Sequence, residues 1–397
     1  MRQGSAVEVL LAFLRLGLTS FGGPVAHIGY FRTEFVARRG WLDEAAFADL
    51  VALCQFMPGP ASSQLGMALG LVRAGPLGMF AAWVGFTAPA AVAMVLFAYG
   101  VGALGDVGQA AWVRGLKLVA VAVVAQAVWG MARTLAPDRA RATLAVAAAI
   151  VALMVPSSLG QVAAIALGGV VGVVVLPRAD MAEGVRAALG VRVPRALALA
   201  LLAVFFALLA LLPVAAAAGG QAVKLVAAFY HAGALVFGGG HVVLPLLQAA
   251  VVPPGWVSND SFLAGYGAAQ AVPGPLFTFA AYLGAAMRPS PNVWLGGLIA
   301  VVAIFLPSFL LVAGLLPFWD TLRHRAAVQA ALRGVNAAVV GVLLAALYSP
   351  VWTSAVHSPA DFALALAAFL LLVVWGVAPW IVVVLGAVGA EVLAVVV

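Results

Sequence analysis

Two short motifs interrupt apolar stretches of the sequence with residues that end one helix and begin another. Phe21-Gly22-Gly23-Pro24 and Pro58-Gly59-Pro60 combine glycine, which permits a backbone break, with proline, which suits the first turn of a helix. The unpaired amides at the start of a helix bind anions, and the helix dipole adds about half a positive charge there. The chemistry expected at both motifs is therefore the binding of an anion.

Both motifs return later in the chain. Phe237-Gly238-Gly239-Gly240 matches the first motif, and Pro273-Gly274-Pro275 matches the second. Four such helix starts that converge would carry about two positive charges, which suits a doubly charged anion. The alternative is that these glycines and prolines only permit kinks and close packing of helices.

Polar side chains near the motifs are candidates for contacting the same anion. Arg15 lies in an apolar run before Phe21, where an arginine is costly to bury; the alternative is that it reaches the membrane interface or pairs with Glu8. Gln55 and Gln270 precede the two Pro-Gly-Pro motifs, and an amide binds an oxyanion without a fixed charge. The alternative for both glutamines is a hydrogen bond between helices.

Two hydroxyl side chains extend this candidate site. Ser62 and Ser63 follow Pro60 in the first turn of the new helix, where the alternative is a capping or back-bonding role. The anion site predicted from the sequence comprises Arg15, Gly22, Gly23, Pro24, Gln55, Pro58, Gly59, Pro60, Ser62, Ser63, Gly238, Gly239, Gly240, Gln270, Pro273, Gly274 and Pro275.

Four titratable residues are candidates for carrying a proton that is coupled to anion movement. His27 and His241 follow the two Phe-Gly-Gly motifs, and His231 is the repeat partner of Arg15. Glu391 lies in the last apolar run. Histidine changes its charge near neutral pH. The alternative is a structural role for each histidine and a position near a helix end for Glu391.

The composition indicates which elements must position these residues. The chain has 397 residues, of which 65% are hydrophobic and 8% are charged, and its mean hydropathy is +1.16. Several apolar stretches reach about 20 residues, which is the length that crosses a bilayer as a helix. We therefore expect an all-α integral membrane protein with two inverted-topology repeats and broken or re-entrant helices.

Other function classes find little support in the sequence. The net charge of +7 comes from basic residues scattered over short loops, so no nucleic acid partner is expected. The single cysteine, Cys54, excludes an internal disulfide and a cysteine metal cluster. No catalytic motif or paired carboxylate stands out, so we expect no enzyme, no metal and no cofactor.

The chain divides into a first repeat over residues 1–177, a basic linker over 178–196 and a second repeat over 197–397. The segments 5–39, 44–73, 221–247 and 259–287 are expected to be broken or re-entrant, because Gly-Gly and Pro-Gly-Pro interrupt them. Membrane spans are expected near residues 76–100, 112–133, 142–156, 160–177, 293–315, 328–348, 361–377 and 380–397, with a connecting helix near 196–213.

The distribution of arginine predicts that the two repeats have opposite orientations. Residues 32–39 hold three arginines, whereas their counterpart, 248–258, holds no Lys or Arg. The reverse is true of residues 101–111, which hold none, and 317–333, which hold three. Because basic loops remain on the cytoplasmic side, matching loops lie on opposite sides of the membrane, and the N-terminus and linker are predicted to be cytoplasmic.

The motif combination resembles the chromate transporter family in its long, two-domain form. The residues that carry the resemblance are Ser20 to His27, Trp41-Leu42, Phe47 and Gln55 to Pro60, and it extends over essentially the whole chain. The resemblance implies a carrier of the bacterial plasma (inner) membrane that expels chromate, and so confers chromate resistance, by proton-coupled antiport. Sulfate is a close structural analogue of chromate.

The second half matches this family pattern more loosely, because Gly240 and Val243 stand where Pro24 and His27 would be. The expected function is export of chromate across the inner membrane by alternating access. The expected partners are chromate or a sulfate-like oxyanion, protons and the lipid bilayer, with a homodimer as an open alternative to a monomer. The alternative function is that of a carrier or channel for sulfate or another inorganic anion.

Overall fold

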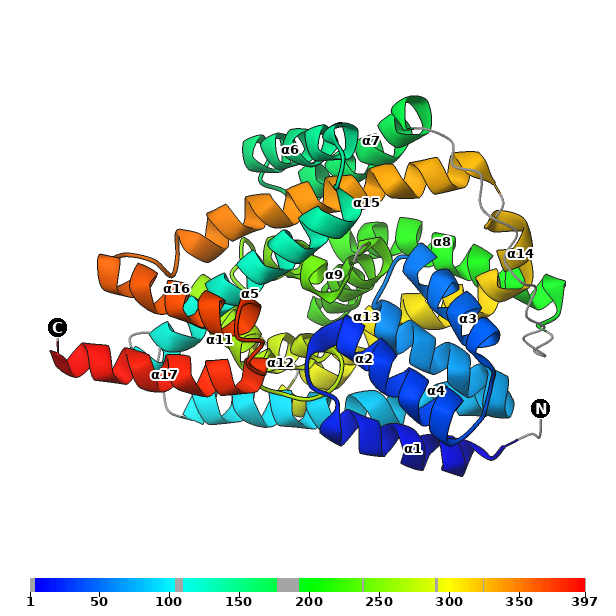
Figure 1. Cartoon of the computed structure of the whole chain (residues 1–397), viewed down its shortest axis with the longest axis horizontal. Coiled ribbons are helices and arrows are strands. Elements are labelled where there is room, and N and C mark those ends of the chain that lie inside the picture. Colours follow the sequence, from blue (N-terminus) through cyan, green and yellow to red (C-terminus); the bar gives the residue numbers. More distant parts are fainter. Residues whose placement is uncertain are drawn as a thin grey trace.

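The computed structural model describes residues 4–103, 110–176, 193–237, 239–289, 292–323 and 325–396. Within these ranges every regular element is helical, which confirms the prediction of an all-α protein (Figure 1). The elements are α1 (Ala6–Thr19), α2 (Gly23–Phe31), η1 (Arg32–Arg38), α3 (Glu44–Phe56), α4 (Ala61–Ala103), α5 (Ala111–Leu135), α6 (Arg139–Met154), α7 (Ser158–Val175), α8 (Arg195–Ala218), α9 (Gln221–Leu235), η2 (Gly240–Val242), α10 (Val243–Val251), α11 (Asn259–Ala269), η3 (Leu276–Thr278), α12 (Phe279–Ala286), α13 (Val293–Leu315), η4 (Leu316–Phe318), α14 (Trp319–Leu322), α15 (Ala326–Ala346), η5 (Leu347–Trp352), α16 (Pro359–Val373) and α17 (Pro379–Val396).

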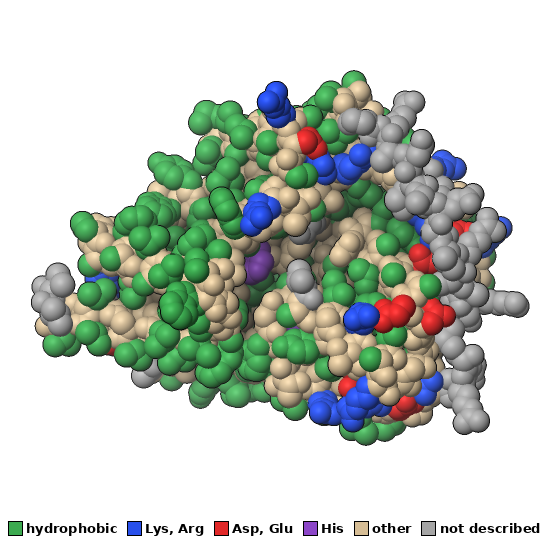
Figure 2. Space-filling model, in the orientation of Figure 1, with side chains coloured by type: hydrophobic (Ala, Val, Ile, Leu, Met, Phe, Trp, Pro, Cys, Tyr) green, Lys and Arg blue, Asp and Glu red, His purple; other side chains and the backbone are tan. Residues whose placement is uncertain are grey.

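In the part of the chain that the structure describes, five helical stretches are long and apolar enough to cross a membrane: α4, α5, α8, α13–α14 and α15–η5. The spans expected near residues 142–156, 160–177, 361–377 and 380–397 form α6, α7, α16 and α17, which are only 15 to 18 residues long. Hydrophobic side chains cover much of the face drawn in Figure 2, and many large apolar side chains are exposed in the described chain. Because such a surface is stable against lipid but not against water, the chain is integral to a membrane.

The two halves of the sequence form matching sets of elements. The helices α1, α3 and α5 match α9, α11 and α15, and the α6–α7 hairpin matches α16–α17. The helix α8 lies between the two sets, where the connecting helix is expected. The opposite orientation of the two sets in the membrane stays a prediction, and most of the linker, residues 178–192, lies outside the described residues.

These elements gather into two bundles. The motif bundle contains α1–α4 and α9–α13, which carry the glycine- and proline-rich motifs, and α8 packs on its α9 and α13. The scaffold bundle contains α5–α7 and α15–α17. In the scaffold bundle the hairpins are exchanged, because α6 and α7 pack on α15 while α16 and α17 pack on α5 (Figure 1). Each half of the sequence therefore supplies the helix hairpin that packs on the long helix, α5 or α15, of the other half.

Glycine permits this exchange at two matching positions. A Cβ atom on Gly115 of α5 would collide with the backbone of Gly386 in α17, and one on Gly334 of α15 would collide with the backbone of Gly168 in α7. Small residues let membrane helices approach until their backbones touch, which increases the van der Waals contact that holds them together.

The helix α4 is a hairpin and not one straight span. Ala74 and Gly75 have non-helical backbone angles, and Gly75 has a φ of +66°. The chain turns back there, so that Gly70 and Gly78 lie against each other. The segment expected over residues 44–73 thus forms α3 and the first arm of this hairpin, and α12 with α13 forms the matching hairpin of the second half.

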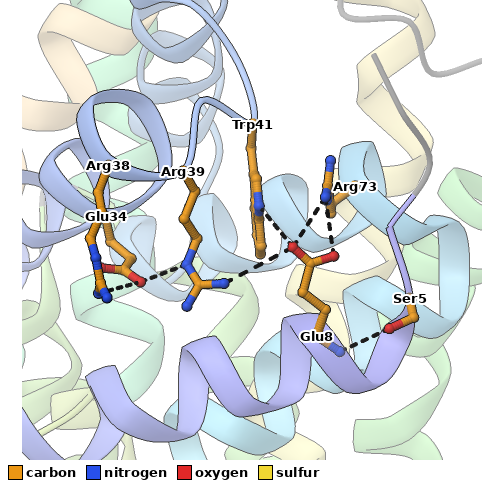
Figure 3. Close-up of polar contacts among 7 residues, drawn as sticks. All are labelled: Ser5, Glu8, Glu34, Arg38, Arg39, Trp41 and Arg73. Atoms are coloured by element: carbon orange, nitrogen blue, oxygen red, sulfur yellow. Dashed lines mark hydrogen bonds and ion pairs between the residues drawn. The ribbon is translucent and has the colours of Figure 1, made fainter.

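A network of charged side chains lies at one end of the motif bundle (Figure 3). The Glu8 carboxylate of α1 accepts hydrogen bonds from Arg73 of α4 at 3.1 Å. The Glu34 carboxylate of η1 accepts from Arg39 Nε at 2.6 Å and from Arg38 at 2.9 Å. Burial acts to raise the pKa of the Glu34 carboxyl, but the hydrogen bonds from Arg39 and Arg38 outweigh it and hold that pKa below its usual value.

Candidate functional site

The four motifs form four breaks in the helices, which are named here by their sequence. The first and second Phe-Gly-Gly breaks are residues 21–23 and 237–239, and the first and second Pro-Gly-Pro breaks are residues 58–60 and 273–275. Gly238, a predicted site residue, lies outside the described residues.

The first Phe-Gly-Gly break separates α1 from α2. Gly22 precedes α2 with a φ of +104°, which a residue with a Cβ atom rarely adopts. Pro24 lies in the first turn of α2, and no side chain caps this turn. The break therefore leaves a helix start whose amides are available to a bound group.

Each Pro-Gly-Pro break is hydrogen-bonded to the residue that precedes the Phe-Gly-Gly break of the other half. The Gly59 amide donates to the carbonyl of Val236, which directly precedes the second Phe-Gly-Gly break, at 2.6 Å. The Gly274 amide donates to the carbonyl of Ser20, which directly precedes the first, at 2.9 Å. The two hydrogen bonds join matching positions of the two halves. We call each place where a Pro-Gly-Pro break meets the Phe-Gly-Gly break of the other half a crossing.

The two crossings are close together. A Cβ atom built on Gly240, at the end of the second Phe-Gly-Gly motif, would lie 3.7 Å from Cγ of Pro24 and 3.6 Å from the Leu276 side chain. Gly240 thus lies against the motif at the first Phe-Gly-Gly break and against the residue that follows the second Pro-Gly-Pro break. The residues expected to act together are gathered from distant parts of the chain.

A cavity of about 400 Å³ opens at one crossing, where the first Phe-Gly-Gly break meets the second Pro-Gly-Pro break. We call it the crossing cavity. Its lining comes from α2, α5, α11, η2, η3 and the turn between α16 and α17, and the residues are Phe21, Gly22, Gly23, Pro24, Tyr30, Val123, Gln126, His241, Ala269, Gln270, Val272, Gly274, Leu276, Leu372, Gly376, Val377, Ala378 and Pro379.

Four polar side chains line the crossing cavity, those of Tyr30, Gln126, His241 and Gln270. Gln270 donates from Nε2 to the Tyr266 carbonyl at 3.3 Å, and Gln126 donates from Nε2 to the Leu372 carbonyl at 3.4 Å. His241 Nδ1 lies 2.7 Å from the Tyr266 hydroxyl. No described lining residue is acidic. Gln126 was not predicted from the sequence, where its only signal is an amide within the apolar α5.

The other crossing is filled by buried polar side chains. Gln64 is fully buried and donates from Nε2 to the Pro58 carbonyl at 2.6 Å, near Ser308 Oγ at 3.4 Å. Ser62 Oγ lies 3.3 Å from Nδ1 of His27, and both side chains are buried. The hydroxyl of Ser63 is buried and has no hydrogen-bond partner among the described residues. These side chains lie inside the protein and do not line the crossing cavity.

Several other predicted residues lie apart from the crossings. Arg15 is on an exposed side of α1, beside exposed leucines. Gln55 is exposed on α3. His231 Nδ1 lies 3.1 Å from the Ala227 carbonyl within α9. The Glu391 carboxylate accepts a hydrogen bond from the Trp112 amide at 3.0 Å, which joins α17 to the start of α5.

Comparison with known protein families identifies the chain. The family model "Chromate transporter" matches residues 7–173 and again residues 223–390. The chain belongs to the chromate transporter family. The two matches together cover most of the chain, and α8 lies between them. Members of this family are transporters and not enzymes, and membership supports chromate transport as the activity of the chain.

Individual relatives agree with this family assignment. A chromate transport protein of Pseudomonas aeruginosa is 30% identical over 347 residues, which cover 85% of this chain and 79% of that protein. A chromate transport protein of Cupriavidus metallidurans is 25% identical over 353 residues, which cover 86% and 81%. An uncharacterized transporter of Bacillus subtilis, YwrB, is 36% identical over 122 residues, or 30% of this chain and 59% of that protein. No solved structure matches the chain.

Proposed function

We propose that the chain exports chromate by alternating access and binds the anion in the crossing cavity. The observation that carries this proposal is the position of that cavity, which lies at the uncapped start of α2 and beside the second Pro-Gly-Pro break. Transporters of this general design bind substrate where broken helices of the two repeats meet.

The lining of the crossing cavity suits a tetrahedral dianion. The start of α2 contributes about half a positive charge through the helix dipole. The amide groups of Gln126 and Gln270 can turn a donor toward an oxyanion. Because the described lining has no carboxylate, it places no fixed negative charge beside a bound dianion.

The membrane potential favours export. A dianion that leaves a negatively charged interior gains about 4.6 kcal/mol per 100 mV, at about 2.3 kcal/mol per charge. Antiport with protons would add to this driving force. His241 is the proton carrier that the geometry favours, because it lines the crossing cavity while His231 and Glu391 lie elsewhere.

The proposal includes a location and an orientation. The chain lies in the bacterial inner membrane with its N-terminus and linker in the cytoplasm, as the arginine-rich segments predict. The alternation of access follows from the opposite orientation of the two halves, which places matching gates on opposite sides of the membrane.

Uptake of chromate by everted membrane vesicles tests the proposal. We expect saturable uptake that requires the protein, that increases with a proton gradient and that excess sulfate inhibits only weakly. Uptake abolished by modest sulfate would make sulfate the substrate. Uptake that does not saturate would indicate a channel, and no uptake of either anion would contradict the proposal.

A further inference from the structure

The two bundles contact each other in an asymmetric way. The helix α11 packs along α5, and α10 packs on α15 and α7. The matching contacts would join α3 to α15, and α2 to α5 and α17, but in the described chain these pairs make marginal contact at most. The motif bundle therefore packs on the scaffold bundle through α10 and α11, whereas the matching α2 and α3 do not pack on the scaffold helices in the same way. The crossing cavity lies between α2, α5 and the end of α11.

Two polar ties hold α11 against the scaffold bundle. Lys117 of α5 is 7% exposed, and its Nζ lies 3.0 Å from Oδ1 of Asp260 in the first turn of α11. Asn259, the first residue of α11, donates from Nδ2 to Ser354 Oγ at 2.6 Å. Both ties connect the same end of α11 to the other bundle.

The first half cannot form the same ties in this state. The residues that match Asn259 and Asp260 are Glu44 and Ala45 at the start of α3. Glu44 forms an ion pair with Arg32 within the motif bundle at 2.7 Å, and alanine has no polar group. The ties at α11 are therefore specific to one end of the molecule.

The contact between α5 and α11 separates two cavities. A second cavity, of about 880 Å³, is lined by Val113 of α5 and by Asp260 and Ala264 of α11. The crossing cavity begins further along the same two helices, at Val123 and Ala269. Between the two cavities the helices come so close that a Cβ atom on Gly267 would collide with the backbone of Leu116.

We propose that the α5–α11 contact is a closed gate of the transporter, held by the Lys117–Asp260 and Asn259–Ser354 ties. The opposite state forms when both ties break, α11 leaves α5 and α3 closes on α15. The larger cavity is the vestibule that opens to the crossing cavity in that state. This inference rests on the proposed transport cycle, but it names the moving contacts and the residues that hold them.

Cross-linking between paired cysteines tests the gate directly. The only native cysteine, Cys54, is 1% exposed and is replaced first by Cys54→Ala. One pair, Val113→Cys with Ala264→Cys, reports the contact that is closed in the structure. The other pair, Ala45→Cys with Asn336→Cys, occupies the positions that match Asp260 and Lys117 and reports the opposite state.

A short bifunctional thiosulfonate links each pair of cysteines. A protease site inserted within residues 178–192 then shows whether the two fragments stay joined after cleavage.

We expect the first pair to cross-link efficiently in the resting protein, and the cross-link to block chromate uptake until a reductant removes it. We expect the second pair to cross-link weakly at rest and more strongly in Asp260→Asn, by roughly two- to fivefold, as for the loss of a partly exposed ion pair. The control is Arg114→Gln, which breaks an ion pair with Asp361 inside the scaffold bundle and should leave cross-linking of both pairs unchanged.

The outcomes separate the gate from the substrate. The extent of cross-linking is measured without chromate, so the expected pattern in a protein that carries no chromate would support the gate and contradict the proposed substrate. Uptake that continues at the normal rate in the cross-linked first pair would overturn the gate. An Asp260→Asn effect no larger than that of Arg114→Gln would overturn the role of the ties.

Discussion

At the scale of single residues, matching positions in the two halves have different surroundings. Gln55 and Gln270 precede the two Pro-Gly-Pro breaks, yet Gln55 is exposed on α3 while Gln270 lines the crossing cavity. The start of α3 is separated from the scaffold bundle and the start of α11 is held against it, so the repeat in the sequence does not give two equal binding sites in one state.

Gln270→Ala tests the crossing cavity against its matched control, Gln55→Ala. A hydrogen bond to a charged group contributes about 1.5–3 kcal/mol, so we expect Gln270→Ala to raise the KM for chromate uptake by roughly tenfold or more. Gln55→Ala should leave uptake nearly unchanged because its side chain is exposed. Equal effects of the two substitutions on vesicle uptake would argue against this cavity as the binding site.

Gly274→Ala tests the backbone of the second Pro-Gly-Pro break. Gly274 has a φ of +99°, and an added Cβ atom would approach the Phe86 carbonyl oxygen to 3.1 Å. Such strain costs about 1–3 kcal/mol, so we expect a lower melting temperature and reduced uptake. Gly29→Ala in α2 is the control, since its Cβ atom would meet nothing within 4 Å. A Gly274→Ala protein that melts and transports like the wild type contradicts this assignment.

The sequence predicts part of the candidate site and misses another part. The Phe-Gly-Gly and Pro-Gly-Pro breaks can be found because glycine and proline act on the local backbone. Gln126 cannot be found in this way, since its matching position in α15 is Ala345 and its place in the cavity depends on how α5 packs. The pairing of each break with the other half likewise depends on tertiary contacts that no local pattern encodes.

At the scale of helices, the apolar runs and polar caps predict most elements. Asp43, Ser258 and Ser358 accept hydrogen bonds from amides in the first turns of α3, α11 and α16, and such caps contribute about 1 kcal/mol each. The hairpin in α4 is less predictable from the sequence, because Gly75 followed by Pro76 also suits a kink in a continuous span.

Glu34→Gln tests the charged network that joins η1 to its neighbours. The folded-state pKa of Glu34 lies below its unfolded value, so its ionised form stabilises the protein above an unfolded pKa of about 4.3, and this contribution is lost as pH falls through the lower folded pKa. We expect Glu34→Gln to lower the melting temperature in detergent at pH 7, and the difference from wild type to shrink under acid conditions.

The control for this prediction is Glu44→Gln, which breaks an ion pair whose two side chains are both more than half exposed. Exposed ion pairs contribute little, so this variant should melt close to the wild type. A difference between Glu34→Gln and wild type that is constant from neutral to acid pH would show that the charge of Glu34 is not what stabilises η1.

At the scale of the whole molecule, the exchanged hairpins make the two halves depend on each other. The helices α6 and α7 cover α15, and α16 and α17 cover α5. When one half is produced alone, the helix faces that the other half would cover are exposed. These faces include the glycine positions where the helices touch.

Division of the chain within residues 178–192 tests this dependence. We expect the two fragments to assemble into an active transporter when they are produced together, because the contacts between halves do not require the linker. Each fragment alone should be degraded or aggregate. Co-purification of the fragments and chromate uptake measure assembly, and a single fragment that is stable and monodisperse would contradict it.

The single buried cysteine has a chemical consequence for a protein that handles chromate. Hexavalent chromium oxidises thiols and thioethers, which would damage a carrier through repeated turnover. Cys54 is 1% exposed within α3, and the described lining of the crossing cavity contains no cysteine and no methionine. The described lining of the proposed chromate site therefore presents no thiol or thioether to the anion, whereas Met287 lines the larger cavity, where its thioether is the group that chromate would oxidise first.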